Sequence, residues 1–191
     1  HENGVSYSEN SSYRPTPGWY GVTKTLAEQL VRGQMERGSL DAAIVNPTWV
    51  YGPGDTTFVP ELVEALNDGS LPHFRDHGEY VLGLVYVYNL TAAIQTILSA
   101  PDGMGRRYIV NDDPPVTFRR FIEELSGRIG APPPKVSLPY GLAYLAACVL
   151  EAGSRLIGRT TRPLLTRQAV ASLGNHVEYD TAALRALGYE Q

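Results

Sequence analysis

Two side chains of opposite acid–base character lie four residues apart near the start of the chain, in the run Trp19-Tyr20-Gly21-Val22-Thr23-Lys24. On an α-helix, residues i and i+4 share one face, so the ammonium of Lys24 can approach the phenol of Tyr20. A nearby cation favours phenolate, which makes tyrosine better suited to general acid–base catalysis at neutral pH. The pair therefore predicts a proton-transfer site.

The alternative for this segment is a surface helix on which the two side chains coincide by chance. Such a short motif also arises at random, because the chain contains twelve Tyr residues. Thr16-Pro17 is typical of a helix start and Arg37-Gly38 of a helix end, which predicts a helix between them. Apolar residues recur at helical spacing within it, at Val22, Leu26, Leu30 and Met35. Other motifs must decide between catalysis and coincidence.

A short apolar run without polar alternation follows at Ala42 to Val45. Such a run is typical of a parallel strand that helices cover on both faces. Asn46-Pro47 comes next, and because proline cannot donate a backbone hydrogen bond, we expect the chain to leave the sheet there. Open α/β sheets bind their ligands at the carboxyl ends of such strands, so this strand end is a second candidate site.

Together these motifs resemble the extended short-chain dehydrogenase/reductases, also called the nicotinamide-dependent epimerase/dehydratase family. The catalytic Tyr-x-x-x-Lys of that family, often with Ser or Thr before the Lys, matches Tyr20, Thr23 and Lys24. Its Pro-x-x-Val-Tyr-Gly-Pro-Gly segment matches Pro47 to Gly54. The resemblance covers nearly the whole chain.

Two further segments carry the resemblance toward the carboxyl end. Leu84 to Leu90 is similar to the family's aromatic-Val-His-Val-Asp junction between a strand and a helix, and Leu184 to Tyr189 is similar to its terminal Leu-Gly-Tyr signature. Tyr86 and Tyr88 replace the usual His and Asp of the junction. Roles of those two polar groups in relatives are therefore not transferred to this chain.

The resemblance implies an α/β fold: the carboxyl-terminal part of a Rossmann-type parallel sheet plus a small, mostly helical substrate-binding domain. Residues 1–55 and 91–113 are assigned to the Rossmann portion, with residues 42–45 and 107–110 as its last strands, and residues 56–90 and 114–191 to the substrate domain. The sequence pattern predicts a further strand at 82–87 and helices at 60–67, 91–100, 117–130 and 140–157.

Family members begin with a strand, a Gly-rich turn and a helix N-terminus that hold the cofactor pyrophosphate. The nineteen residues before Tyr20 are rich in Ser, Asn, Glu and Pro, and we expect a loop there, without a strand. The chain is therefore expected to be the carboxyl-terminal part of a longer enzyme, whose missing amino-terminal half is its partner. The catalytic Ser or Thr, and the residues that distinguish NAD from NADP, are expected upstream of His1.

The resemblance also implies the role of each site residue. Tyr20 exchanges a proton with the substrate oxygen, and Lys24 holds the nicotinamide ribose hydroxyls of NAD or NADP. Asn46 is either a site residue or a hydrogen-bonded strand end. The residues expected to line the nicotinamide ring are Pro47, Thr48, Trp49 and Val50.

The histidines do not indicate a metal site, because none of the four has other potential metal ligands at the usual spacing. Nor are they arranged as in a catalytic triad. We expect a solvent-exposed place for each. Their positions are His1, His73, His77 and His176.

Three features favour an apolar substrate over a nucleotide sugar. Leu138 to Leu150 carries no charge and resembles the Leu-Pro-Tyr and apolar helix of relatives that act on steroids. Leu82-Gly83 occupies positions where nucleotide-sugar relatives commonly have Arg-Asp. No Lys or Arg occurs between Arg37 and Arg75, where a diphosphate needs charged partners.

We therefore predict an NAD(P)-dependent oxidoreductase that interconverts a carbonyl and a secondary alcohol on an apolar or aromatic substrate. Two alternatives remain. One is a nucleotide-sugar epimerase or dehydratase, and the other is a non-catalytic NAD(P)-binding sensor.

The amino-acid composition limits which partners and which cellular compartment are expected. The formal net charge is −4 and the basic residues are scattered, which argues against a nucleic-acid partner. A single Cys excludes an internal disulfide framework and agrees with a reducing cytoplasm. The uncharged residues 138–150 are too few to span a bilayer, so core packing or a lid over the substrate is favoured over interfacial membrane contact. A homodimer remains open.

Overall fold

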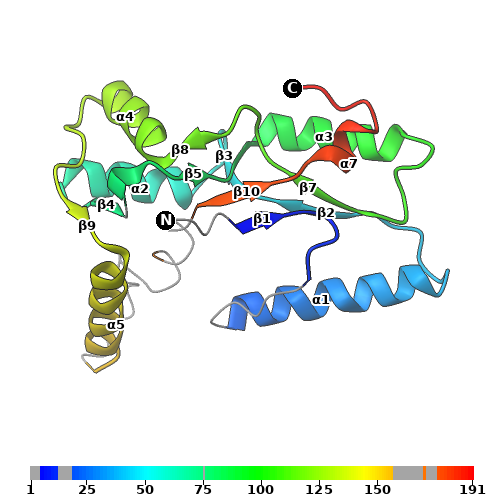
Figure 1. Ribbon diagram of the computed structural model, residues 1–191, viewed down its shortest axis with the longest axis horizontal. Coiled ribbons are helices and arrows are strands. Elements are labelled where there is room, and N and C mark those ends of the chain that lie inside the picture. The colour runs from blue at the N-terminus through cyan, green and yellow to red at the C-terminus, as the bar shows by residue number, and fades with distance from the viewer. Residues whose placement is uncertain (1–4, 13–18, 75, 157–169, 171–175) are drawn as a thin grey trace. The chain divides into compact units, whose positions relative to one another are not determined.

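The computed structural model describes residues 5–12, 19–74, 76–156, 170 and 176–191 (Figure 1). The contacts divide the chain into two compact units. Residues 6–53, 83–114 and 178–191 form one, called here the sheet unit; residues 1–5, 54–82 and 115–177 form the other, called the helical unit. The two units divide the chain differently from the expected domains at residues 1–5, 54–55, 83–90, 114 and 178–191. The assignment of cofactor and substrate roles to the two parts stays a prediction.

The sheet unit is built on two parallel strand pairs. In the first, β2 (Ile44–Pro47) lies beside β7 (Arg107–Val110), with Ile44 opposite Arg107 and Pro47 opposite Val110. In the second, β3 (Trp49–Tyr51) lies beside β6 (Leu84–Tyr86). The unit also contains α1 (Trp19–Glu36), α3 (Val87–Ser99) and α7 (Ala182–Arg185). Parallel pairing with helical connections confirms the α/β class.

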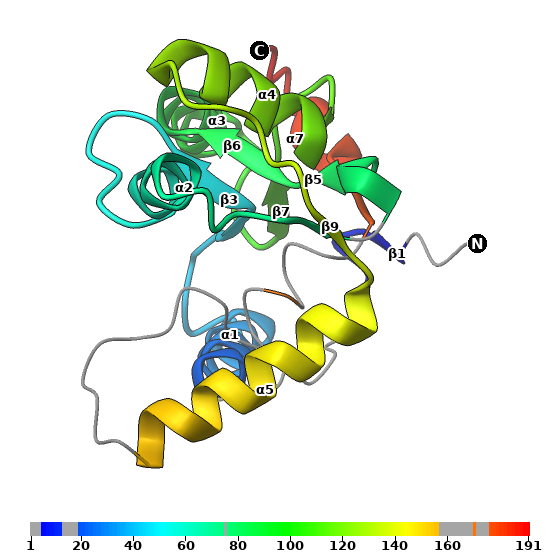
Figure 2. The same ribbon diagram turned by 90° about the vertical axis from the view of Figure 1, so that its left-hand side faces the viewer.

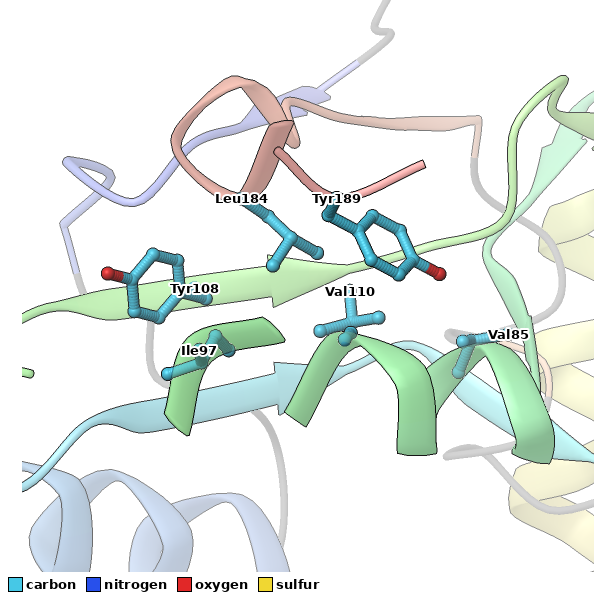
Figure 3. Packing of buried hydrophobic residues seen from close by; sticks show 7 residues of the cluster. Val85, Ile97, Tyr108, Val110, Leu184 and Tyr189 are labelled. Atoms are coloured by element: carbon cyan, nitrogen blue, oxygen red, sulfur yellow. The ribbon is translucent and has the colours of Figure 1, made fainter. Parts of the chain in front are cut away.

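The core of this unit lies on one face of β7. Tyr108 and Val110 are fully buried and pack with Ile97 of α3, Leu184 of α7 and Tyr189 (Figure 3). Side chains alternate along a strand, so the intervening residues of β7 point to the opposite face. Figures 1 and 2 show α1 and α3 on opposite sides of the β2–β7 pair. The two faces of the pair therefore meet different helices.

The helical unit holds α2 (Phe58–Asn67), α4 (Phe118–Ile129) and α5 (Tyr140–Leu156). Its short strands pair as β4 (His73–Phe74) with β9 (Ser137–Leu138), and as β5 (Val81–Leu82) with β8 (Val116–Thr117); a 3₁₀ turn, η1, covers Asp76–Gly78. The ends of α4 follow from its sequence: the Thr117 hydroxyl accepts from the Arg120 N–H at 3.2 Å, and Gly130, at φ 72°, ends the helix in the left-handed region.

Most predicted elements are found within a few residues of their expected bounds. The strand at 107–110 matches, α2, α4 and α5 agree within two residues, and α3 begins four residues earlier than expected. The strand expected at 82–87 is interrupted at Gly83, between β5 and β6. The predicted helix start at Thr16-Pro17 lies outside the described residues.

One expectation about strands is wrong. The segment before Tyr20 contains β1 (Val5–Tyr7), which pairs with β10 (Val177–Tyr179), a partner about 170 residues away that no local pattern could indicate. The strand expected at 42–45 is found two residues later as β2, and it ends at Pro47, where the sequence predicted a strand end. The Ile44 N–H donates to the carbonyl of Arg106, just before β7, and the Thr48 N–H donates to the carbonyl of Val110 in β7. The Pro47 nitrogen therefore faces the other edge of β2, where the described residues contain no partner strand and the missing N–H costs no ladder hydrogen bond.

The expectation of solvent-exposed histidines is also wrong for two of them. His73 is only 8% exposed, and its ring meets Phe118 edge to face. Burial, together with the positive charge of Arg119, lowers the pKa of His73 below its ordinary value. His176 Nδ1 accepts a hydrogen bond from the Val81 N–H at 3.2 Å. His77 is exposed, as expected, and His1 lies outside the described residues.

The buried His73 predicts a pH dependence of stability in the complete protein. The pKa of His73 is lower in the folded protein than in the unfolded chain. As the pH falls below about 6.5, His73 therefore binds a proton in the unfolded chain but not in the folded protein. The free energy of unfolding then falls by at most about 1.4 kcal/mol per pH unit. His73→Gln should flatten this loss in denaturant unfolding measured from pH 7.5 to 5, whereas His77→Asn should retain it. Equal slopes in the two variants would contradict the assignment.

The open edge of β2 predicts the behaviour of residues 1–191 alone. Within the described residues β2 pairs only with β7, and an apolar strand with a free edge invites pairing with other chains. We expect this piece neither to bind NADH or NADPH measurably nor to remain a monomer. Fluorescence titration and sedimentation measure both properties. Micromolar binding by a compact monomer would show that the site needs no further chain.

Candidate active site

Tyr20 and Lys24 lie together on the first two turns of α1, as their spacing predicts. The Lys24 ammonium lies over the Tyr20 ring, 5.6 Å from its centroid. Tyr20 is 65% exposed, so its phenol is accessible. The Thr23 hydroxyl instead donates to the Tyr20 backbone carbonyl at 2.9 Å, which occupies it on its own helix. The pair can therefore meet a ligand, and its catalytic role stays a prediction.

The helix that carries this pair, α1, is attached to the strands in an unusual way. None of the eighteen residues of α1 is buried, and its large apolar side chains Trp19, Leu26 and Leu30 are exposed. A helix in a globular protein ordinarily binds its sheet through an apolar stripe. In place of an apolar stripe, the side of α1 that faces the sheet carries Glu28, the least exposed charged side chain of the helix. Glu28 contacts polar groups of the strands.

Glu28 contacts both strands of the first pair through its two carboxylate oxygens. Arg107 of β7 donates to Oε1 at 3.0 Å, and the side-chain amide of Asn46 on β2 donates to Oε2, also at 3.0 Å. The Glu28 and Arg107 side chains are 14% and 15% exposed. Sequence reasoning missed both residues, because they lie 79 positions apart. The available signal was the position of Glu28, four residues after Lys24 on the same helix.

Asn46, which the sequence left ambiguous, is thus at least a hydrogen-bonded strand residue. Its amide nitrogen is oriented by the Glu28 carboxylate, which can only accept. Its amide oxygen is buried and has no hydrogen-bond partner among the described residues. A buried acceptor of this kind normally has a partner, so Asn46 retains one free acceptor for a donor from outside the described structure.

The four residues expected to line the nicotinamide ring connect β2 to β3. Pro47 is exposed, at the carboxyl end of β2. The Thr48 N–H and hydroxyl both donate to the Val110 carbonyl, at 3.0 and 3.3 Å, and the Trp49 N–H donates to the Gly83 carbonyl at 3.1 Å. Val50 packs against the core of the sheet unit. Their contacts with cofactor stay a prediction.

Asp112 binds Tyr51, the residue that follows these four, and sequence reasoning missed Asp112 as well. Its Oδ2 accepts from the Tyr51 phenol at 3.3 Å and from the Tyr86 N–H at 2.9 Å. Its Oδ1 accepts from the side-chain amides of Asn89 and Gln191, at 2.9 and 2.8 Å. One carboxylate thus joins β3, β6, α3 and the carboxyl-terminal residue.

Gly83 occupies a place where no side chain fits. A Cβ at this position would lie 2.4 Å from the Tyr179 ring and 3.2 Å from the Thr48 methyl group. An Asp here, as nucleotide-sugar relatives commonly have, would therefore require Tyr179 to move. Burial raises the pKa of Tyr179 to about 12, so this phenol gives up its proton less readily than an ordinary tyrosine.

Comparison with known proteins places these residues in a family. The model of the NAD-dependent epimerase/dehydratase family matches residues 1–111. The chain belongs to this family. The match covers the Tyr20–Lys24 pair and the end of β2, and it ends one residue before Asp112.

Curated relatives cover most of the chain. A 2-alkyl-3-oxoalkanoate reductase of Shewanella oneidensis is 26% identical over 90% of this chain and 47% of its own length. A 4-hydroxy-2-methyl-3-oxo-4-farnesyl-3,4-dihydroquinoline-1-oxide ketoreductase of Stigmatella aurantiaca is 33% identical over 92% of this chain and 52% of its own length. The chain spans about half the length of these relatives.

Solved structures confirm the Rossmann-type fold. The crystal structure of gox2253 matches with a TM-score of 0.69 and 26% identity, over 98% of this chain and 56% of that chain. The UDP-glucuronic acid 4-epimerase of Bacillus cereus, solved with NAD, matches with a TM-score of 0.68 over 99% of this chain and 52% of its own. At 16% identity the second likeness shows the fold alone.

Two features of the described residues bear on ligands and membranes. No group of three or more His, Cys, Asp or Glu side chains there could hold a metal ion. Nor does the described part of the chain contain a helix that is long and apolar enough to cross a membrane.

Gly52, in the segment that matches the family motif, yields a stability prediction. It has φ 122°, and a Cβ would lie 2.6 Å from the Tyr86 ring. Gly54, at φ 90°, has open space around its Cβ position. Both Gly→Ala changes should destabilise through backbone strain of about 1–3 kcal/mol, and Gly52→Ala should cost more because the ring must also shift.

Denaturant unfolding of the complete protein measures this difference. Equal losses at the two positions would show that Tyr86 moves aside without cost, and that Gly52 serves the backbone conformation alone.

Proposed function

We propose that the complete protein is an NAD(P)-dependent oxidoreductase that interconverts a carbonyl and a secondary alcohol on an apolar or aromatic substrate. The observation that carries the proposal is the Tyr20–Lys24 pair, exposed on one helix of a chain that belongs to the NAD-dependent epimerase/dehydratase family. The family description, and relatives named as reductases, support oxidoreductase chemistry.

The residues present fit a nicotinamide cofactor. An exposed ammonium and phenol, at Lys24 and Tyr20, suit ribose hydroxyls and a reacting oxygen. Pro47 is exposed at the carboxyl end of a parallel strand, where ligands of open α/β sheets bind. The Asn46 amide oxygen beside it has no hydrogen-bond partner among the described residues and offers an acceptor. We therefore assign NAD or NADP as cofactor, with Pro47, Thr48, Trp49 and Val50 along the nicotinamide ring.

Each side chain then has a defined task. Tyr20 donates its phenolic proton to the substrate oxygen during reduction and takes it back during oxidation. Lys24 holds the ribose hydroxyls, and its charge favours the phenolate that forms when Tyr20 has given up its proton. Bound NAD or NADP accepts or supplies the hydride.

Three observations support an apolar substrate. The Shewanella and Stigmatella relatives are named as reductases of keto groups on alkyl or farnesyl-bearing molecules. The Tyr179 ring fills the space that an Asp at position 83 needs. In α5, the side chains of Leu142, Leu145 and Val149 are 58 to 64% exposed, which offers apolar surface for a lid.

The alternatives have narrower support. A nucleotide-sugar epimerase or dehydratase is favoured by the description of the family and by fold likeness to proteins such as the Bacillus cereus epimerase. A non-catalytic NAD(P)-binding sensor has no need of Tyr20 and Lys24 together, and both are present on α1. Neither alternative accounts for the Gly83–Tyr179 contact.

Replacing the phenol tests the role of Tyr20. In the complete protein, Tyr20→Phe should lower the rate constant of single-turnover hydride transfer by about 10² to 10⁴, because a general acid is lost, while the affinity for cofactor stays nearly unchanged. Lys24→Ala should lower both. The matched control is Tyr88→Phe, another exposed tyrosine of the sheet unit. Equal rate constants for wild type and Tyr20→Phe would remove Tyr20 from the mechanism.

A substrate panel tests the class of substrate. Steroid, flavonoid and aryl ketones or alcohols should give changes in NAD(P)H absorbance with the complete protein, and nucleotide sugars should give none. Calorimetry with UDP-glucose tests the nucleotide-sugar alternative. Tight binding that is lost when Arg75 or another Arg of the helical unit is replaced would establish the nucleotide-sugar alternative instead.

A further inference from the structure

The attachment of α1 to the β2–β7 pair is polar, and it is centred on one carboxylate. Glu28 accepts from Arg107 through Oε1 and from Asn46 through Oε2, each at 3.0 Å. Arg107 in turn donates through Nη2 to the carbonyl oxygens of Ser8 and Ser11, at 3.4 and 3.0 Å, and to that of Glu9. The contact thus connects α1, β2, β7 and the segment after β1.

The strand register explains why one carboxylate reaches both strands. Ile44 is opposite Arg107 in the parallel pair, and Asn46 is two residues further along β2. With a side-chain period of two, Ile44 and Asn46 point to the same face, and the paired Arg107 shares it. Tyr108 and Val110 point to the other face and are buried in the core. The face toward α1 therefore carries Asn46 and Arg107 beside the apolar Ile44 and Ile109, while Tyr108 and Val110 face α3.

Burial makes this contact different from an ordinary surface ion pair. The Glu28 and Arg107 side chains are about 85% shielded, so a lost partner leaves a charge that water only partly solvates. The same helix offers a comparison in the pair Arg32–Glu36, also at 3.0 Å but with side chains 54% and 66% exposed. Exposed i,i+4 pairs contribute little, and this one stays within α1.

The position of Glu28 along α1 links the contact to the candidate site. It follows Lys24 by one helical turn and Tyr20 by two, so Tyr20 lies about 12 Å further along the helix axis. A tilt of α1 by about 10° around Glu28 would move the Tyr20 backbone by about 2 Å, and a misplacement of 1 Å can cost 10²-fold in rate. No residue of α1 is buried, so no buried apolar side chain of the helix resists such a tilt.

We propose that Glu28 is a positioning residue, which, clamped by Arg107 and Asn46, fixes the direction of α1 and so places Tyr20 and Lys24 for proton transfer. The proposal rests on the proposed function for its catalytic consequence. The fixation of α1 itself is a structural claim that is measured without any substrate.

The test compares Glu28→Gln with the matched variant Glu36→Gln in the complete protein. Single-turnover reduction of an aryl ketone of the panel, with saturating NADPH or NADH, separates two effects. Loss of folded enzyme lowers the amplitude, whereas misplacement of Tyr20 lowers the rate constant. Glu28→Gln should lower the rate constant at least tenfold and keep the amplitude within twofold. Glu36→Gln should leave both within twofold of wild type.

Hydrogen–deuterium exchange of peptides from residues 19–36 supplies the readout that needs no substrate. Glu28→Gln should speed exchange of these amides at least tenfold, and Glu36→Gln should not. Unchanged exchange in Glu28→Gln would overturn the clamp even if turnover fell. A fall in amplitude with an unchanged rate constant would reduce Glu28 to a structural residue and overturn its positioning role.

Arg107→Lys is the second variant in case Glu28→Gln does not fold. It keeps a cation beside Glu28 but loses the fork that reaches both the carboxylate and the backbone carbonyls, so it should show the same two changes at smaller size. Wild-type rate constant and exchange in Arg107→Lys would overturn the proposal. If Tyr20→Phe proves as active as wild type, the proposed function fails, and the exchange measurement alone decides whether Glu28 fixes α1.

Discussion

The β2–β7 pair imposes the constraint on which the sheet unit depends, because its two faces are chemically different. One face presents Tyr108 and Val110, which are fully buried against α3 and α7. The other presents Arg107, which shares the carboxylate of Glu28 with Asn46 of β2. Apolar burial is non-directional, whereas a charged hydrogen bond between fixed partners is directional. The face with Tyr108 and Val110 therefore stabilises the unit by apolar burial. On the other face, which also carries Ile44 and the buried Ile109, the polar contact with Glu28 orients the helix that carries Tyr20 and Lys24.

The exposure of the candidate site and the match to only about half the length of the relatives have one physical explanation. α1 has no buried residue, β2 pairs along one edge within the described residues, and the Asn46 amide oxygen lacks a partner there. The relatives are about twice as long as this chain. Further chain in those proteins would supply strand partners and apolar cover at such places. In this account the described residues contribute the proton-transfer pair and the strand end, and the rest of the complete protein contributes the cover.

The sequence predicted what depends on local pattern and on motif. The spacing of Tyr20 and Lys24 placed them on one helix face, and the strand predicted at 107–110 is found as the parallel strand β7. It could not predict contacts set by distant segments. β1 is three residues long and pairs across the whole chain, Arg107 meets Glu28 only in the fold, and His73 is buried by a neighbour on α4, Phe118. The exclusion of Asp from position 83 likewise becomes visible only when Tyr179 lies beside it.

A crystal structure of the complete protein with NAD or NADP and a bound ketone tests the central claim most directly, since it measures the arrangement on which proton transfer depends. The account predicts the Tyr20 phenolic oxygen within about 2.6 to 3.2 Å of the substrate oxygen. It also predicts the Lys24 ammonium at the nicotinamide ribose and the nicotinamide ring beside Pro47 to Val50. A nicotinamide bound elsewhere, with Tyr20 facing solvent in the ternary complex, would contradict it.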